Sequence, residues 1–396
     1  MKKFNSMLML ALLFLIASCS SKSKGDITAV NVLGTGNYSN LGAVTVTDFG
    51  DDEEEQVLLL ESNSPEPETG DPTGFFFDLL GTGAISDGYN DDTGDGFDDA
   101  SEFTILTEDT FDAGTNFPFR AENDTDQAYL EDVDGDGNAD QLVLLATTDG
   151  GLEVVRKIYV FPSFDCQGDA TACGVARYLD CVTNPTMSSA DIDIQIESDL
   201  GSDDDGVNEG TADTTDSLAA PYYFATSDPG DDTSIGYVIG QAQAALAPVL
   251  AQFDPEDDED FFFNWGTESI APSERACFMH YVVLGNTEND NEAGDNPASD
   301  ILQLARDVYA SHPRVGILAA EDADIRNFTP AKDFQAIVGE DDSAPKNTRV
   351  TVTNADSNVS TTALTNANGA FTAYLHCDAG DSIEITASGF SKSIDC

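Results

Sequence analysis

Acidic side chains alternate along one short segment of this 396-residue chain. Asp132, Asp134 and Asp136 stand at every second position, and Gly137 directly follows the third of them. Carboxylates with this spacing converge on one point when the chain turns sharply, and the glycine permits the turn. A backbone carbonyl and a further acid complete a shell of hard oxygen ligands, which favours Ca²⁺ over transition metals. The segment therefore predicts a calcium site formed by Asp132, Asp134, Asp136, Asn138 through its carbonyl oxygen, and Asp140.

The residues after this segment distinguish it from an EF-hand. Val143 occupies the twelfth place, where an EF-hand has glutamate, and the run 141–145 (QLVLL) is typical of a strand. The loop and its following strand resemble the calcium loops of FG-GAP and VCBS-type repeats. This resemblance implies a β-sheet setting of the kind found in extracellular β-propellers and adhesive surface proteins. The alternative is a solvated Asp-Gly turn that holds no ion.

A second acidic loop lies 41 residues earlier and has a similar spacing, which is compatible with a repeated β unit. Thr93 replaces the carboxylate at its third place, and Glu102 stands at its twelfth. A third acidic run, 203–206, has Gly201 where the first ligand would stand, so we predict a plain loop there. The second loop is the weaker calcium candidate, with the ligand positions Asp91, Thr93, Asp95, Phe97, Asp99 and Glu102.

The first nineteen residues carry a different kind of chemistry. Lys2 and Lys3 precede the apolar run 7–17, which has the length of a signal peptide and is short for a membrane span. The following Ile16-Ala17-Ser18-Cys19 resembles the lipobox of bacterial lipoproteins. The resemblance implies cleavage before Cys19, lipidation of that cysteine and a membrane anchor, and Ser20 fits sorting to the outer membrane. The alternative is an ordinary secretory signal with an unrelated cysteine.

The charge of the chain excludes some classes of partner. Sixteen Lys and Arg stand against 74 Asp and Glu, for a formal net charge of −58. No basic patch can be assembled to neutralise phosphates, which excludes nucleic acid binding, and an anionic membrane surface would repel the protein. Two compatible explanations are a halophilic or marine source and calcium loading of clustered Asp. We expect salt adaptation for most of the charge and calcium for a few loops.

Six cysteines remain after Cys19, and an even number in an exported chain indicates three disulfides. The spacing favours a local bridge between Cys377 and Cys396. The other four would then pair among themselves in an order that the sequence does not determine. A metal site on the first three is disfavoured, because none of them forms a C-x₂-C pair. The four cysteines whose pairing stays open are Cys166, Cys173, Cys181 and Cys277.

The chain carries none of the familiar catalytic motifs, such as Gly-x-Ser-x-Gly, His-Glu-x-x-His or a phosphate-binding glycine loop. His280 lies in the strand-like run 278–284, where alternation places it with apolar residues, so we predict a core position. We therefore expect a protein that is not an enzyme. The alternative is an extracellular hydrolase, for example on glycans, that uses carboxylates of the segment 218–340.

The pattern of apolar runs predicts a mainly β, multidomain protein with β-sandwich or repeat-type β domains and a few helices in the middle domain. Pro297 and the apolar spacing after it predict a helix over 296–311, and a second, shorter helix is predicted over 321–328. The expected order is a signal peptide (1–18), a lipidated tether (19–26), a β-rich domain with calcium loops (27–185), an acidic loop or linker (186–217), a mixed β domain with short helices (218–340) and an Ig-like module (341–396).

The last of these segments resembles bacterial Ig-like and carboxypeptidase-regulatory-like modules. The resemblance rests on the alternating run 349–354, the Asn-Gly turn before Phe371, and the Gly-Asp turn at Gly380. It implies a spacer or ligand-presenting unit. Together these features predict a lipid-anchored calcium-binding protein of the outer membrane or cell surface. Its expected role is adhesion, binding of an extracellular protein or polysaccharide, or envelope scaffolding.

Overall fold

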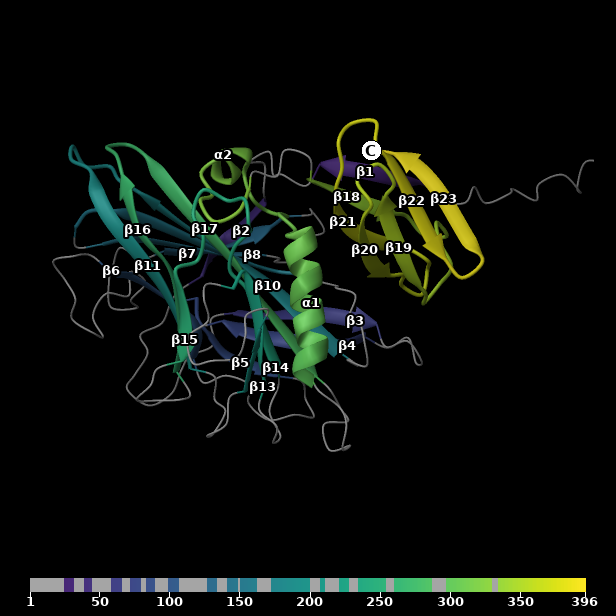
Figure 1. Ribbon diagram of the computed structural model, residues 1–396, viewed down its shortest axis with the longest axis horizontal. Helices are drawn as coiled ribbons and strands as arrows, with labels where there is room; N and C mark the ends of the chain where they lie inside the picture. The colour runs from purple at the N-terminus through teal and green to yellow at the C-terminus, as the bar shows by residue number, and fades with distance from the viewer. Residues whose placement is uncertain are drawn as a thin grey trace, which may run out of the picture.

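A computed structural model describes most of the strands of the chain and several of its connections. The described residues are 25–31, 39–44, 58–65, 72–79, 83–89, 99–106, 127–133, 141–148, 150–161, 172–199, 207–210, 221–227, 234–253, 260–286, 297–329 and 334–396. They form a mainly β protein, as predicted, and Figure 1 shows two β-sandwiches of unequal size.

The larger sandwich, called here the main sandwich, consists of two antiparallel sheets. The nine-stranded sheet has the order β12 (Val207–Gly210), β13 (Tyr223–Ser227), β14 (Ser234–Val238), β17 (Arg275–Asn286), β10 (Ala172–Thr183), β9 (Glu153–Val160), β8 (Gln141–Thr147), β7 (Gln127–Asp132), β2 (Ser39–Val44). The seven-stranded sheet has the order β15 (Leu250–Phe253), β16 (Asp260–Ile270), β11 (Ala190–Asp199), β6 (Asp99–Leu106), β5 (Ile85–Tyr89), β4 (Pro72–Leu79), β3 (Leu58–Pro65).

Alternating side chains fill the space between the two sheets. On β11, Ile192, Ile194 and Ile196 are buried while the polar residues between them are partly exposed. A strand sends successive side chains to opposite faces, so this pattern fixes which face packs on the core. Phe263 and Trp265 of β16 join the same core, and the indole N–H donates to the carbonyl oxygen of Ile239 over 2.7 Å.

The nine-stranded sheet is covered on its other face as well. Helix α1 (Pro297–Ser311) buries Ile301, Leu304, Ala305 and Val308 against it, which confirms the helix predicted from the sequence. Its central strands are therefore buried on both faces and read as continuous apolar runs. Helix α1 lies between the main sandwich and the C-terminal part of the chain (Figure 1). Among the described residues, no helix is long and apolar enough to cross a membrane.

The second predicted helix is mostly an irregular segment. Helix α2 covers only Ala319–Asp322, and Ile325 instead forms a bridge to Cys277 of β17. The backbone N–H of Cys277 donates to Asp324, and that of Arg326 donates to Cys277. The sheet thus supplies hydrogen bonds that a longer helix would have made internally. We call residues 312–329 the strap.

The smaller, C-terminal sandwich combines distant parts of the chain. Its three-stranded sheet has the order β1 (Ile27–Asn31), β18 (Phe334–Gly339), β21 (Phe371–His376). Its four-stranded sheet has the order β20 (Val359–Leu364), β19 (Arg349–Asn354), β22 (Ser382–Ala387), β23 (Phe390–Asp395). Residues 341–396 are all-β, as predicted. The three-stranded sheet also contains β1 from the expected domain 27–185 and β18 from the expected domain 218–340. Phe161 of the main sandwich meets Tyr374 of β21 edge to face, with ring centroids 5.8 Å apart.

The sheets also correct the expected acidic linker at 186–217. Residues 190–199 and 207–210 are β11 and β12, and each belongs to one sheet of the main sandwich. β11 pairs with β16, from Ala190 opposite Ile270 to Asp199 opposite Asp260, and β10 pairs with β17 across a still longer stretch of sequence. The expected segments 27–185 and 218–340 therefore share both sheets. Composition could not indicate this, because the acidic residues of β11 alternate with the buried isoleucines.

Removal of the disulfide between Cys181 and Cys277 should strongly destabilise the main sandwich. The bridge links residues 96 apart in sequence, and closing a loop of that length restricts the unfolded chain by about 4 to 5 kcal/mol in the entropic model. The measurement is denaturant unfolding of Cys181→Ala/Cys277→Ala, followed by the fluorescence of Trp265, the only tryptophan. Cys377→Ala/Cys396→Ala is the matched control, because its bridge spans 19 residues in the other sandwich. An equal shift of the Trp265 transition in both variants would contradict the expectation.

Candidate functional site

The 132–140 segment forms the connection of a β-hairpin. Asp132 is the last residue of β7, Gln141 is the first of β8, and Glu131 pairs with Gln141 in the register. The motif is thus flanked by strands, in agreement with its departure from the EF-hand pattern. Asp132 is only 4% exposed. Its neighbours in the predicted ligand set lie outside the described residues: Asp134, Asp136, Asn138 and Asp140.

A chain of buried and part-buried hydrogen bonds fixes the base of this hairpin. The Gln141 Nε2 atom donates to Glu131 Oε2 over 2.7 Å, which ties the two ends of the loop together. Arg177 of β10 donates to Gln141 Oε1 over 2.6 Å and also to the carbonyl oxygen of Val315 in the strap. Gln141 and Arg177 are fully buried. The entry and exit of the loop are therefore positioned by the core of the sheet and not by the loop itself.

Gly316 of the strap approaches this base closely. Its φ is +77°, a left-handed conformation that favours glycine, and a Cβ built there would lie 2.8 Å from Gln141 Oε1. The close approach leaves no space for a side chain between the strap and the hairpin base. The hairpin and the strap are consequently in direct packing contact.

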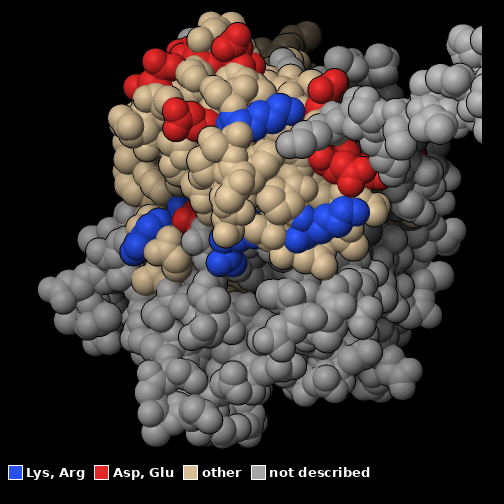
Figure 2. All heavy atoms as spheres, turned by 90° about the vertical axis from the view of Figure 1, so that its right-hand side faces the viewer, with Lys and Arg blue, Asp and Glu red and all other residues tan. Residues whose placement is uncertain are grey.

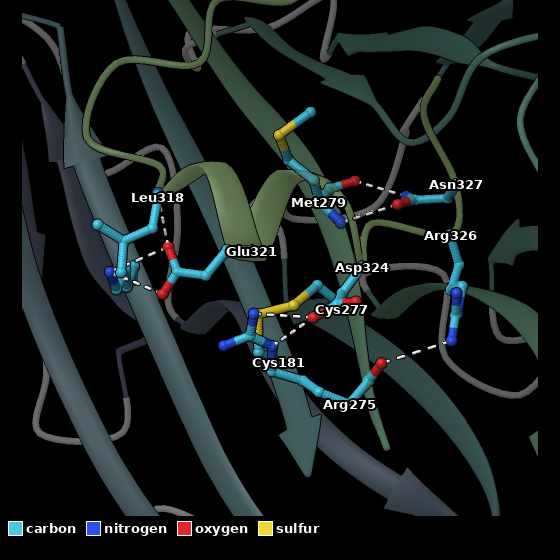
Figure 3. Close-up of a disulfide and its surroundings, with 10 residues drawn as sticks. Cys181, Arg275, Cys277, Met279, Leu318, Glu321, Asp324, Arg326 and Asn327 are labelled. Carbon is cyan, nitrogen blue, oxygen red and sulfur yellow. Dashed lines mark hydrogen bonds and ion pairs between the residues drawn. A yellow bond between two sulfur atoms is a disulfide. The ribbon is translucent and has the colours of Figure 1, made fainter. Parts of the chain in front are cut away.

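The strap is held on the sheet by ion pairs and amide hydrogen bonds, several of which Figure 3 shows beside the Cys181–Cys277 disulfide. Lys157 Nζ lies 2.9 Å from Glu321 Oε1, with both side chains 6% exposed. Arg275 lies 2.8 Å from Asp324, and Arg314 pairs with Asp322. Asn327 accepts from the N–H of Met279 and donates to its carbonyl oxygen, as an edge strand would (Figure 3).

The predicted ligands of the hairpin connection have the donor chemistry that a hard divalent cation requires. Every predicted ligand position offers oxygen, and Asp132 is anchored at a strand end where its backbone is part of the sheet. Among the described residues, no group of three or more His, Cys, Asp or Glu side chains could hold a metal ion. That search covers only Asp132 of the five ligand positions. The donor chemistry and the hairpin placement are therefore the two observations that bear on calcium.

The weaker second loop also connects two strands. It lies between β5 and β6, where Ile85 pairs with Ala100. Asp99 and Glu102 belong to β6, opposite Asp199 and Glu197 of β11 in the register. The remaining candidate positions, Asp91, Thr93, Asp95 and Phe97, lie outside the described residues. Both candidate loops are thus hairpin connections, one in each sheet of the main sandwich.

Two disulfides are present among the described cysteines. Cys377 and Cys396 are bonded, which confirms the predicted local bridge, and Cys181 pairs with Cys277 of the neighbouring strand. Cys173 lies in β10, while Cys19 and Cys166 lie outside the described residues.

His280 lies in the core between the two sheets, as predicted. It is fully buried, stacks on Tyr178 with ring centroids 4.6 Å apart, and finds no hydrogen-bond partner within the described part of the chain. Burial lowers the pKa of His280 well below its ordinary value of 6.5, and the charge of Arg156 lowers it further. The imidazole is therefore neutral and shielded from water.

Buried arginines are the feature that sequence reasoning missed. Arg156 lies 3.1 Å from Asp180, with side chains 0% and 1% exposed, and donates to the carbonyl oxygen of Ser101 over 2.5 Å. Burial raises the pKa of Asp180 to about 6, against the opposing effect of Arg156. Arg177 and Arg314 are also fully buried. The available signal was the placement of Arg156 and Arg177 inside the apolar runs 154–160 and 174–182.

No family model and no curated protein matches the chain. Solved structures match the chain only loosely, and two of them serve as examples. One is a polysaccharide lyase, with 10% identity and a TM-score of 0.28, matching 87% of this chain and 46% of that one. The other is a TPR-domain containing protein from Parabacteroides distasonis, with 8% identity and a TM-score of 0.35, matching 66% of this chain and 54% of that one. The chain spans about half the length of each, and similarity at this level carries no argument about activity.

Replacing His280 with glutamine should make stability less sensitive to acid. Folded His280 stays neutral, whereas the unfolded residue takes a proton below about pH 6.5, so acid favours unfolding of the native protein. Between about pH 7.5 and about pH 5.5 this contributes a loss of about 1.4 kcal/mol. Asp180, with a folded pKa of about 6, acts in the opposite direction but is present in both proteins. Urea titrations at the two pH values measure the difference, and identical pH dependence in the two proteins would contradict it.

Proposed function

We propose that this chain is an exported, lipid-anchored protein of the cell envelope that binds calcium and acts in adhesion, partner binding or scaffolding without catalysis. The observation that carries the proposal is the placement of the 132–140 motif as a hairpin connection whose base is fixed by one part-buried and one buried hydrogen bond. A binding loop on a rigid scaffold is the usual arrangement for recognition. The anchor is proposed from the lipobox-like residues that end at Cys19.

The chain's own residues would prepare the loop for the ion. Asp132 enters from the end of β7, and Gln141 closes the loop by its hydrogen bond to Glu131. Bound Ca²⁺ would offset the repulsion among the clustered carboxylates and couple the order of the loop to the folding of the sheet. The Arg177 contact to Val315 would extend that stabilisation to the strap. A rigid hairpin end and a firmly docked strap then present a defined surface to a partner.

Calcium should raise the thermal midpoint of the purified protein, and a chelator should remove the increase. At a free calcium concentration of about 100 times Kd, the stabilisation is about 2.7 kcal/mol. Asp136→Ala should abolish the difference, because it removes a central carboxylate of the predicted site. Asp205→Ala is the matched control, since it lies in an acidic run without a residue to serve as first ligand. If the unchanged protein melts identically with calcium and with chelator, the motif is only a turn.

The anchor is tested independently of calcium by Cys19→Ser. In a bacterial host that processes lipoproteins, the unchanged chain should fractionate with membranes and incorporate labelled fatty acid. The variant should not incorporate the fatty acid, since its side chain offers no thiol for lipidation. Equal membrane association and equal labelling of the two chains would reject the anchor and leave the calcium result unaffected.

A further inference from the structure

The C-terminal sandwich has a hollow on its open side. The hollow measures about 410 Å³ and is lined by Asp26, Ser343, Phe390, Ser391 and Lys392, together with two glycines. β1 and β23 are the edge strands of their two sheets, and the lining residues come from the start of β1, from β23 and from the turn after β18. Its volume falls in the range of about 300 to 1,000 Å³ that is usual for small-molecule sites.

Two opposite charges line this hollow without neutralising each other. Asp26 and Lys392 are not within ion-pair distance, and the described part of the chain provides neither side chain with another partner. Every other described Lys and Arg has a hydrogen bond or an ion pair, including the exposed Lys346, which lies 3.6 Å from Asp342. Lys392 is therefore exceptional in a chain with a net charge of −58.

Lys392 projects from the core-facing side of β23. It pairs in the register with Ile385, which is buried, and it is less exposed than Ser391 and Ser393 on either side of it. The half-buried ring of Phe390 lies two positions away on the same side as Lys392. The residues that line the hollow thus include a lysine, an aspartate and a phenylalanine.

We infer that the hollow binds a small zwitterionic group, with its ammonium toward Asp26, its phosphate or carboxylate toward Lys392, and its carbon chain against Phe390. A simple anion would be repelled by Asp26, and a simple cation by Lys392. Opposite charges attract, and like charges repel, more strongly beside a protein wall than in bulk water. Only a ligand that carries both charges gains from both side chains. The aromatic ring favours the ammonium end as well.

The surroundings of the hollow suit a ligand with an anionic end. Residues 334–396 hold eight acidic and three basic side chains, against 66 and 13 in residues 1–333. Figure 2 views this side of the molecule, where Lys and Arg side chains lie apart from one another on a mostly uncharged surface and most of the acidic groups lie in its upper part. The general repulsion of anions by this protein is therefore weakest here.

The position of Asp26 suggests that the zwitterionic ligand could be a lipid headgroup as well as a free small molecule. The N–H of Glu340 donates to the Asp26 carbonyl oxygen over 3.1 Å, which fixes the start of β1 against the end of β18. Asp26 stands seven positions after Cys19, so a fully extended tether spans at most about 25 Å. If the proposed lipid anchor exists, the hollow lies within reach of phospholipid headgroups. Ethanolamine phosphate in a headgroup and a free amino acid or phosphoamine share the required charges.

Calorimetric titration with O-phosphoethanolamine tests the site, with ethanolamine and inorganic phosphate as probes of one charge each. The zwitterion should bind at least tenfold more tightly than either half. Asp26→Asn and Lys392→Gln should each weaken binding at least tenfold. The matched controls Glu384→Gln and Lys346→Gln, which change exposed residues of the same sandwich, should leave binding unchanged. Retained thermal midpoints establish that the variants fold. Equal binding by Lys392→Gln and the unchanged protein, or equal binding of inorganic phosphate, would overturn the inference.

Vesicle flotation distinguishes the two sources. The chain carrying Cys19→Ser, which has no anchor of its own, is mixed with phosphatidylcholine vesicles that contain or lack phosphatidylethanolamine. Recruitment that requires phosphatidylethanolamine and Lys392 assigns the site to a headgroup. Binding of the soluble probe without recruitment assigns it to a free zwitterion. Recruitment that Lys392→Gln leaves unchanged would overturn the headgroup assignment, whatever the outcome of the anchor test.

Discussion

β10 and β17 pair along twelve residues, from Ala172 opposite Asn286 to Thr183 opposite Arg275, and the central part of this ladder is buried on both faces. One face packs on the seven-stranded sheet, and the other carries α1 and the strap. Cys181 and Cys277 are directly opposite residues of the same ladder and are joined by a disulfide. The hairpin base, the strap and the inter-sheet core all depend on this pairing, because each contacts a residue of β10 or β17.

Four of the ten Lys and Arg residues in the described part of the chain are buried. Arg156, Lys157, Arg177 and Arg314 are buried, and each finds a carboxylate, an amide or a carbonyl oxygen as partner. Removing one partner of such a pair leaves an uncompensated charge in a medium of low dielectric constant, which is strongly destabilising. These four basic groups are therefore absent from the surface and do not offset the charge of its carboxylates. Salt would screen the repulsion among surface carboxylates far more than it weakens the buried pairs.

This distribution also explains why the two sandwiches differ in character. The main sandwich combines a strongly acidic sequence with loops whose spacing suits calcium, and its polar interior is tied together by arginine. The C-terminal sandwich is less acidic, carries its own disulfide and has a hollow where opposite charges remain separate. Function proposed for the first depends on ions that offset repulsion. The function proposed for the C-terminal sandwich depends on Asp26, at the start of the edge strand β1, and on Lys392 of the edge strand β23.

Local pattern was sufficient for the class of fold, the strands around 142–146 and 278–284, the helix over 297–311, the core position of His280 and the bridge between Cys377 and Cys396. Each of these depends on period, burial or short spacing, which a sequence expresses directly. The calcium motif is likewise local, and its chemistry remains a prediction from spacing. Only the tertiary structure joined β1 to the C-terminal sandwich, placed β11 in the main sandwich, and brought Asp26 to Lys392. Such pairings join residues up to several hundred positions apart, and no local pattern encodes which strand edges will meet.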